Sequence, residues 1–130
     1  MPDILIVEDN QVNQKLIAFL LARAGFTYDM AENGAVALQK LAAEPYRLVL
    51  MDIMMPVMNG YDATRAIRND PRLKDLPIVA LTANAMRGEE ERCRAVGCND
   101  FIAKPYSKDV VLATIARLIE PPAAQAAPTA

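Results

Sequence analysis

The sequence contains no histidine and only two cysteines, Cys93 and Cys98, which stand five residues apart. Without histidine, the chain cannot use an imidazole as a general base, as a nucleophile or as a phosphoryl carrier. Two cysteines without further cysteine or histidine ligands do not make a zinc site. We therefore expect both cysteines to be free thiols, as in a protein of the reducing cytoplasm.

Long apolar runs and an excess of basic residues are also missing. No apolar stretch approaches the roughly 20 residues that a membrane-spanning helix needs, and the first ten residues, MPDILIVEDN, lack the pattern of a signal peptide. The net charge of -2 provides no basic surface for nucleic acid. With 53% hydrophobic and 23% charged residues in a chain of 130, we expect one compact soluble domain.

The hydrophobic pattern alternates between short apolar runs and longer segments with helical spacing. The short runs predict strands at 4–7, 27–31, 48–51, 78–81 and 100–103. The longer segments predict helices at 11–24, 35–43, 61–69, 85–96 and 107–119. Short, continuously apolar strands are typical of a parallel sheet that is covered on both faces. The sequence therefore predicts an α/β fold with five βα units over residues 1–119 and a disordered Pro/Ala-rich tail over 120–130.

Polar residues stand at the ends of four of these strands. Glu8 and Asp9 follow the first strand, Asp52 the third, Thr82 the fourth and Lys104 the fifth. In an open parallel sheet the carboxyl ends of the strands lie on one edge, so strand order 2-1-3-4-5 would bring the three carboxylates together. Crowded carboxylates require a cation, and oxygen ligands without histidine or thiolate favour Mg²⁺. Asp52 is then either a metal ligand alone or also a nucleophile that forms an aspartyl-phosphate.

Four segments of the chain resemble the receiver domain of two-component response regulators. They are LIVEDN, LVLMDIMMPVMNG, IVALTANA and FIAKP, in the order and spacing of that family, and the resemblance covers residues 3–119. The stretches ALTANAM and GCNDFIAKP are especially similar to receivers of phosphorelays and hybrid histidine kinases. The resemblance implies a flavodoxin-like, doubly wound parallel sheet of strand order 2-1-3-4-5.

The resemblance also implies which residues bind the metal and accept the phosphoryl group. Asp52 occupies the position of the phosphoacceptor. Asp9 and Asp52 would bind Mg²⁺ directly, together with the backbone carbonyl of Met54, while Glu8 would act mainly through water. This chain would therefore carry out its own phosphoryl transfer and a slow autodephosphorylation, without being an enzyme for other substrates.

A second group of positions would contact the phosphoryl group and transmit its arrival. The resemblance implies that Lys104 contacts one phosphoryl oxygen and that Thr82 hydrogen-bonds another, with Ala83 beside it. Phe101 occupies the family's aromatic switch position, whose ring moves inward when Thr82 shifts toward the phosphoryl group. A packed core aromatic is the alternative interpretation of Phe101.

The resemblance implies two partners: a histidine kinase or histidine phosphotransfer protein that donates the phosphoryl group, and a downstream protein target. The chain itself would be a monomer or a weak dimer. The predicted helix at 11–24 carries large apolar residues over roughly 200° of its surface, whereas a helix on a sheet needs about 100°. The surplus is either core packing or an exposed docking surface for the donor. In the second case, Ile17, Leu21 and Tyr106 are the predicted docking residues.

Other functions are compatible with parts of this pattern. A receiver-like adaptor would bind partners without being phosphorylated, and the chain could equally be a receiver taken from a hybrid histidine kinase. A phosphohydrolase with an aspartyl-phosphate usually has a second acid two residues after the nucleophile, where this chain has Met54. A flavin-binding domain of similar topology would have a Ser/Thr-rich loop after the first strand, where this chain has EDNQVNQ.

Overall fold

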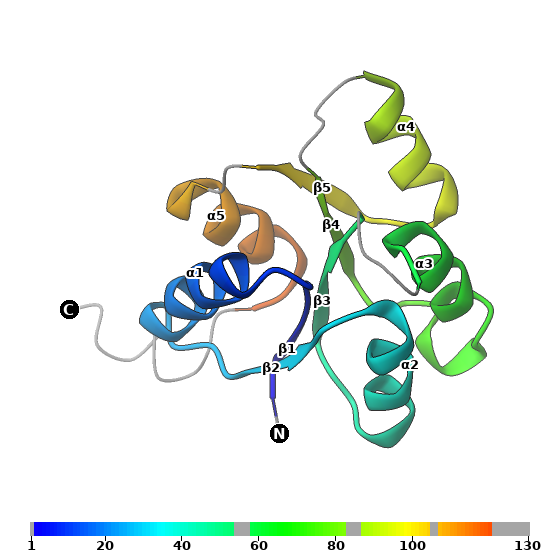
Figure 1. Ribbon diagram of the computed structural model, residues 1–130, viewed down its shortest axis with the longest axis horizontal. Helices are drawn as coiled ribbons and strands as arrows, with labels where there is room; N and C mark the ends of the chain where they lie inside the picture. The colour runs from blue at the N-terminus through cyan, green and yellow to red at the C-terminus, as the bar shows by residue number, and fades with distance from the viewer. Residues whose placement is uncertain (1, 54–57, 83–86, 105–106, 121–130) are drawn as a thin grey trace.

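The computed structural model describes residues 2–53, 58–82, 87–104 and 107–120. Within them, strands and helices alternate along the chain, as the sequence predicts (Figure 1). The strands are β1 (Ile4–Val7), β2 (Tyr28–Ala31), β3 (Leu48–Asp52), β4 (Ile78–Thr82) and β5 (Asp100–Ala103). The helices are α1 (Gln11–Arg23), α2 (Gly34–Ala43), α3 (Gly60–Arg68), α4 (Arg87–Val96) and α5 (Lys108–Leu118), and a 3-10 turn, η1 (Pro71–Leu73), precedes β4.

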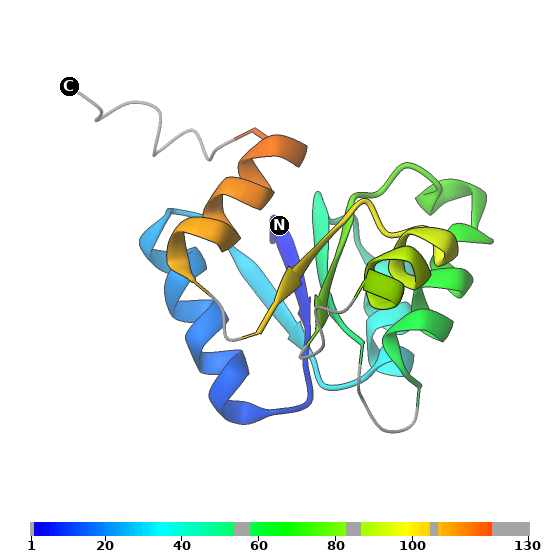
Figure 2. The same cartoon turned by 90° about the horizontal axis from the view of Figure 1, so that it is seen from above.

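The five strands form one parallel sheet in the order β2-β1-β3-β4-β5, which confirms the predicted order. Helices α1 and α5 cover one face of the sheet, and α2, α3 and α4 cover the other (Figures 1 and 2). Because all strands run in the same direction, their carboxyl ends lie on one edge.

Side chains alternate across the sheet, so each strand contributes to two cores. Ile4 and Ile6 belong to the core that includes residues of α1 and α5, whereas Leu5 and Val7 belong to the core beneath α2, α3 and α4. All residues of β1, β3 and β4 are buried. Burial on both faces is the reason that these strands read as continuous apolar runs.

The ends of the helices have local causes in the sequence. Asn10, Asn33 and Asn59 are the N-cap residues of α1, α2 and α3, and each side chain accepts a hydrogen bond from a backbone N–H in the first turn. Gly25 and Gly97 follow α1 and α4 with φ angles of 90° and 116°, a conformation that favours glycine. Among the described helices, none has the length and apolar character required to span a membrane.

Candidate functional site

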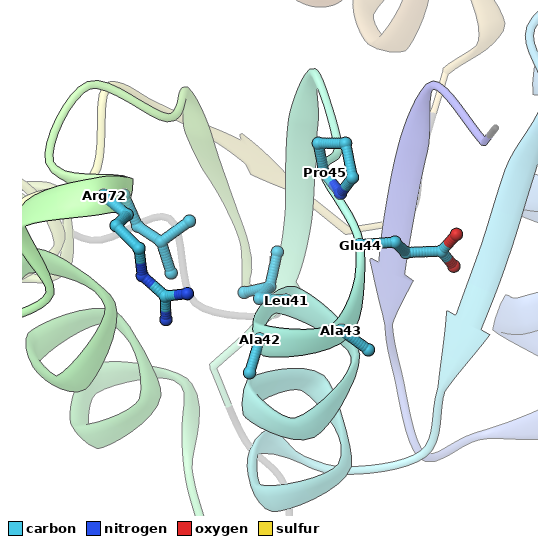
Figure 3. Close-up of a pocket in the computed structure, with 7 residues that line it drawn as sticks. Leu41, Ala42, Ala43, Glu44, Pro45 and Arg72 are labelled. Carbon is cyan, nitrogen blue, oxygen red and sulfur yellow. The ribbon is translucent and has the colours of Figure 1, made fainter.

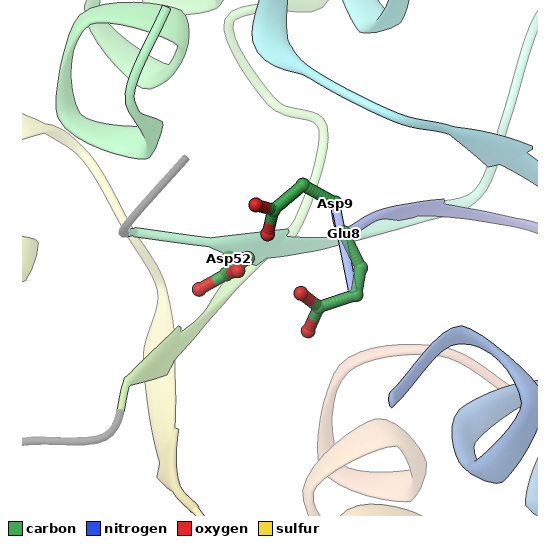
Figure 4. Close-up of side chains that lie close together, drawn as sticks. All are labelled: Glu8, Asp9 and Asp52. Atoms are coloured by element: carbon green, nitrogen blue, oxygen red, sulfur yellow. The ribbon is translucent and has the colours of Figure 1, made fainter. Parts of the chain in front are cut away.

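Three carboxylates meet where β1 and β3 lie side by side. Val7 pairs with Met51 in the sheet, so Glu8 and Asp9 emerge next to Asp52, the last residue of β3. One carboxylate oxygen of each of these three residues lies within 4.8 Å of the others, and the three side chains surround a common space (Figure 4). The side chains of Glu8 and Asp52 are buried, while Asp9 is exposed.

Lys104 brings a positive charge to these acids. Its Nζ lies 3.2 Å from Oδ1 of Asp52 and 3.5 Å from Oε1 of Glu8. The backbone N–H of Lys104 donates to the carbonyl oxygen of Thr82 over 2.7 Å, which continues the pairing of β4 and β5 past the end of β5. One ammonium group therefore faces two of the three carboxylates, and the cluster keeps an excess of negative charge.

The pKa of Glu8 responds to its burial and to this excess of negative charge. Burial raises the pKa of Glu8, and the hydrogen bond to Asp52 and the charge of Asp52 raise this pKa further. The backbone N–H of Asn10, which donates to Oε2 of Glu8 over 3.2 Å, and the Lys104 ammonium act in the opposite direction without reversing the shift. The environment of Glu8 therefore disfavours its charged form relative to that of an exposed glutamate.

The donor set fits a hard divalent cation. Carboxylate oxygens from the ends of adjacent strands can converge on one ion, and an oxygen-only donor set with one exposed member, Asp9, suits Mg²⁺, which keeps several of its waters. The uncompensated negative charge is what a divalent cation would neutralise. The backbone carbonyl of Met54, which the resemblance to receiver domains adds to this set, lies outside the described residues, as does Ala83.

Thr82 is the last residue of β4, the strand that pairs with β3. Leu81, the residue before Thr82, is paired with Asp52. The Thr82 hydroxyl donates to Oε1 of Glu89, a residue of α4, over 3.4 Å. The same Glu89 oxygen accepts a hydrogen bond from the Tyr61 hydroxyl of α3 over 2.5 Å. Sequence patterns do not single out Glu89 or Tyr61, because neither residue stands at a strand end.

Gly60 lies directly against the backbone that carries Asp52. A Cβ atom at Gly60 would stand 2.4 Å from the carbonyl oxygen of Asp52 and 2.8 Å from Cα of Ile53. The backbone N–H of Gly60 donates to the carbonyl oxygen of Ile53 over 3.0 Å. The absence of a side chain at Gly60 therefore permits the close approach that holds the start of α3 against the end of β3.

Phe101 of β5 is half-buried and packs against the core beneath α2, α3 and α4. It pairs with Ala80 of β4, two residues before Thr82. This position is compatible both with a packed core aromatic and with a switch residue.

The predicted docking residues of α1 are corrected by the structure. Ile17 and Leu21 are 1% and 0% exposed and lie in the core between α1, α5 and the sheet. They face the sheet because the buried residues of α1, Ile17, Leu20 and Leu21, form the stripe that covers it. Tyr106 lies outside the described residues.

The surplus apolar residues of α1 lie on a different arc of the helix. Val12, Leu16 and Phe19 are 73%, 39% and 58% exposed, and their spacing of four and three residues places them on one side of the helix. The Arg23 guanidinium lies 5.6 Å from the centre of the Phe19 ring and continues the same side. Helix α1 therefore has an exposed apolar surface, formed by Val12, Leu16 and Phe19 and not by Ile17 and Leu21.

Surface hollows also lie away from the carboxylates. One of about 270 Å³ is lined by the end of α2, by Pro45 and by Arg72 and Leu73 of η1 (Figure 3). Pro45 precedes β3 and Leu73 precedes β4, so this hollow lies at the amino ends of the strands. It has no part in the chemistry of the carboxyl edge.

The sequence matches the family described as "Response regulator receiver domain" over residues 4–116. The chain belongs to this family. It is therefore a signalling receiver and not an enzyme in the classical sense. Receiver domains of this family have histidine kinases and phosphotransfer proteins as partners.

Among curated proteins, this receiver is 38% identical over 112 residues to the polar-differentiation response regulator DivK of Brucella anthropi, across 86% of this chain and 91% of DivK. Among solved structures, it is similar to the receiver domain of the sensor histidine kinase PA1611 from Pseudomonas aeruginosa PAO1. That match has 38% identity and a TM-score of 0.84 over 90% of this chain and 96% of the other. The PA1611 receiver has a magnesium ion coordinated in its active-site cleft.

A third similar structure contains two proteins. It is the receiver domain of the Saccharomyces cerevisiae response regulator Ssk1 bound to the histidine phosphotransfer protein Ypd1. The match has 29% identity and a TM-score of 0.83 over 91% of this chain and 89% of the other. These structures confirm the receiver fold, with five parallel strands in the order 2-1-3-4-5.

Proposed function

We propose that this receiver accepts a phosphoryl group on Asp52 from a phosphohistidine of a histidine kinase or phosphotransfer protein, and that the modification changes its contacts with a downstream protein. The observation that carries the proposal is the buried Asp52 carboxylate, which has Glu8, Asp9 and the Lys104 ammonium around it. Membership of the receiver family supports the same assignment.

Glu8, Asp9 and Asp52 would hold Mg²⁺, with the Met54 carbonyl as a further ligand. The bound ion would supply positive charge to the oxygens of the phosphoryl group during its transfer. The acidic cluster of this chain and the magnesium ion of the PA1611 receiver support this assignment.

The chain's own residues then account for the rest of the transfer. A carboxylate oxygen of Asp52 attacks phosphorus, the P–N bond of the phosphohistidine breaks, and its electron pair returns to the imidazole of the donor. Lys104, already 3.2 Å from Asp52, exchanges part of that contact for a phosphoryl oxygen. The Thr82 hydroxyl and the backbone at Ala83 hydrogen-bond the remaining oxygens, and Phe101 adjusts to the new position of Thr82.

The donor docks, in this proposal, on the exposed apolar side of α1, formed by Val12, Leu16 and Phe19. Asn10, which caps α1, directly follows Asp9, so this side of the helix begins beside the carboxylates. A large exposed apolar patch next to a reactive group is typical of a protein-binding surface. The complex of the similar Ssk1 receiver with a phosphotransfer protein supports a donor of that class.

The test uses acetyl phosphate as donor, with Mg²⁺ present. The parent protein is expected to gain one acid-stable, base-labile phosphoryl group, and Asp52→Asn is expected to lose it while keeping its circular dichroism spectrum. Asp109→Asn, which removes an exposed carboxylate from α5, is the matched control and is expected to be labelled like the parent. If Asp52→Asn is labelled to the same extent, the assignment of Asp52 is wrong.

The same experiment distinguishes the proposed function from that of an adaptor that is not phosphorylated. A phosphorylation-independent adaptor would remain unlabelled in the parent form, and Asp52→Asn would leave its affinity for the downstream protein unchanged. The proposed function instead requires labelling of the parent and a partner affinity that changes with it.

A further inference from the structure

One oxygen of Glu89 receives hydrogen bonds from two different elements. The Tyr61 hydroxyl of α3 donates to Oε1 of Glu89 over 2.5 Å, and the Thr82 hydroxyl at the end of β4 donates to the same oxygen over 3.4 Å. Glu89 itself lies in the first turn of α4 and is half-buried. The carboxylate therefore links α3, β4 and α4 at a single atom.

The two hydrogen bonds differ in strength. The bond from Tyr61 is short and charge-assisted, and the Tyr61 side chain is held in place by burial and by the Arg92 guanidinium, 4.4 Å from the centre of its ring. The bond from Thr82 is at the long end of the accepted range. The contact with Tyr61 thus fixes Glu89, while the contact with Thr82 is the one that can be exchanged.

We propose that Glu89 competes with the phosphoryl group for the hydroxyl proton of Thr82, and that the outcome of this competition decides whether the first turn of α4 is hydrogen-bonded to the end of β4. The inference rests on the proposed function, because it requires a phosphoryl group on Asp52. It adds Glu89 of α4 to the residues that take part in that function. Glu89 is neither at a strand end nor among the proposed metal ligands.

The chemistry of the hydroxyl makes the two interactions exclusive. A threonine hydroxyl has one proton and can donate it to one strong acceptor at a time. A phosphoryl group adds about two negative charges and three acceptor oxygens, on a residue whose strand is paired with that of Thr82. When Thr82 donates to the phosphoryl group, Glu89 keeps its bond to Tyr61 and loses its bond to β4.

The consequence is a change in α4. Without the Thr82 bond, the first turn of α4 is attached through Tyr61 to α3 but no longer through this contact to β4. Phosphorylation of Asp52 would then change the surface that α3 and α4 present to a downstream protein. Glu89 itself does not need to move for this change, because its hydrogen bond with Tyr61 remains.

The test is a double-mutant cycle on the affinity for beryllofluoride, used with Mg²⁺ as a stable stand-in for the phosphoryl group and measured by calorimetry. Glu89→Ala is expected to bind it about two- to tenfold more tightly than the parent, the range that one net hydrogen bond supplies. In a Thr82→Val background, Glu89→Ala is expected to change the affinity by less than about twofold, because the competing proton is absent. Glu91→Ala, which removes an exposed glutamate from the same helix, is the matched control and is expected to match the parent.

The cycle separates competition for the proton from simple charge repulsion. Repulsion between Glu89 and the anion would persist in the Thr82→Val background, so equal effects of Glu89→Ala in both backgrounds would overturn the proposal. A parent that binds beryllofluoride, with no effect of Glu89→Ala, would overturn it as well and leave the proposed function intact. A parent that neither binds beryllofluoride nor is labelled by acetyl phosphate would overturn the proposed function, and this inference with it.

Hydrogen exchange of the α4 amides gives a second, independent measurement. Beryllofluoride with Mg²⁺ is expected to speed exchange in residues 88–96 of the parent. Glu89→Ala is expected to show that faster exchange before beryllofluoride is added. Identical exchange of α4 in the parent with and without beryllofluoride would overturn the proposed link between Thr82 and α4.

Discussion

The Lys104 ammonium lies 3.2 Å from Oδ1 of Asp52, although β4 separates β3, which ends at Asp52, from β5, which Lys104 follows. The lysine side chain reaches past β4 and also comes within 3.5 Å of Glu8. It is the cation that faces both buried carboxylates among the ion pairs of the described residues. The stability of the protein without metal should therefore depend on it.

We expect Lys104→Met to destabilise the metal-free protein by about 1–3 kcal/mol at neutral pH, because removing one partner of a buried ion pair leaves an uncompensated charge. The estimate is below the full cost of such a loss, since the lysine side chain is 20% exposed. Urea denaturation in the presence of a chelator measures the change. Lys108→Met, at an exposed position of α5, is the control; equal stability of both variants would contradict the ion-pair account.

The second prediction concerns Asp9, the exposed member of the carboxylate cluster. We expect Asp9→Asn to weaken Mg²⁺ binding by about tenfold or more, equivalent to at least roughly 1.4 kcal/mol, because a charged ligand is lost. The same change should stabilise the metal-free fold by about 0.5–1 kcal/mol, since it relieves repulsion from Glu8 and Asp52.

Calorimetry with Mg²⁺ and thermal melts in chelator measure these two effects. Glu32→Gln removes an exposed acid that follows β2 on the same edge of the sheet and should change neither quantity by a comparable amount. A metal-free Asp9→Asn protein that melts below the parent would refute the picture of mutually repelling carboxylates.

The third prediction separates the two sides of α1. Replacing both Val12 and Phe19 by Ser should slow phosphotransfer from the cognate phosphohistidine protein by about tenfold or more, as expected for the loss of interface anchors. Labelling by acetyl phosphate should remain as in the parent. Tyr28→Ser, which changes an exposed aromatic residue of β2, should leave both reactions unchanged.

Ile17→Ala provides the contrast from the buried side of the same helix. Because Ile17 is 1% exposed, its truncation should cost about 2–5 kcal/mol of stability. The rates of phosphorylation by both donors should fall only in proportion to the fraction of the Ile17→Ala protein that is folded. If the Val12 and Phe19 double variant loses phosphotransfer from the phosphohistidine protein and labelling by acetyl phosphate to the same extent, docking on the exposed side of α1 is ruled out.

The fourth prediction uses acid and a site remote from the carboxyl edge. Burial acts to raise the pKa of Asp29, but hydrogen bonds from the Met30 backbone N–H, the Lys40 ammonium and the Tyr46 hydroxyl lower it overall. The unfolded chain therefore binds a proton at Asp29 more readily than the folded protein does. This carboxylate contributes stability above its ordinary pKa of 3.8, and the contribution is lost as the pH falls through the lowered value.

Asp29→Asn should accordingly destabilise the protein by roughly 1 kcal/mol at neutral pH, a modest value because the side chain is 32% exposed. The free energies of unfolding of parent and variant should converge as the pH falls below 3.8. Urea titrations from pH 7 to pH 3 follow the difference. A difference that stays constant over this range would mean that the Asp29 charge has no part in stability.

The carboxylate cluster could be predicted from the sequence because its members stand at strand ends. The ends of parallel strands coincide in space, so Glu8, Asp9 and Asp52 could be brought together once the strand order was assumed. The sheet itself follows from continuous apolar runs, which have few interpretations when glycine and asparagine mark the ends of the intervening helices.

The contacts of helices were harder to predict. The apolar residues of α1 form two stripes, and helical periodicity alone does not say whether Ile17 or Leu16 faces the sheet. Glu89 was missed for a related reason, since its partner Tyr61 lies 28 residues away on another helix and no spacing rule connects the two. Gly60 likewise reveals its role only through the backbone of Asp52, which a sequence pattern does not place beside it.

The position of Lys104 after β5 also has a consequence for biosynthesis. A nascent chain that has emerged as far as β4 already contains Glu8, Asp9 and Asp52 at the ends of the adjacent strands β1 and β3, but it lacks the ammonium group that follows β5. During that interval the carboxylates have no lysine to offset their repulsion. A divalent cation would then be the main counter-charge for the three carboxylates, so the stability of this intermediate should depend on the cation more strongly than that of the finished protein.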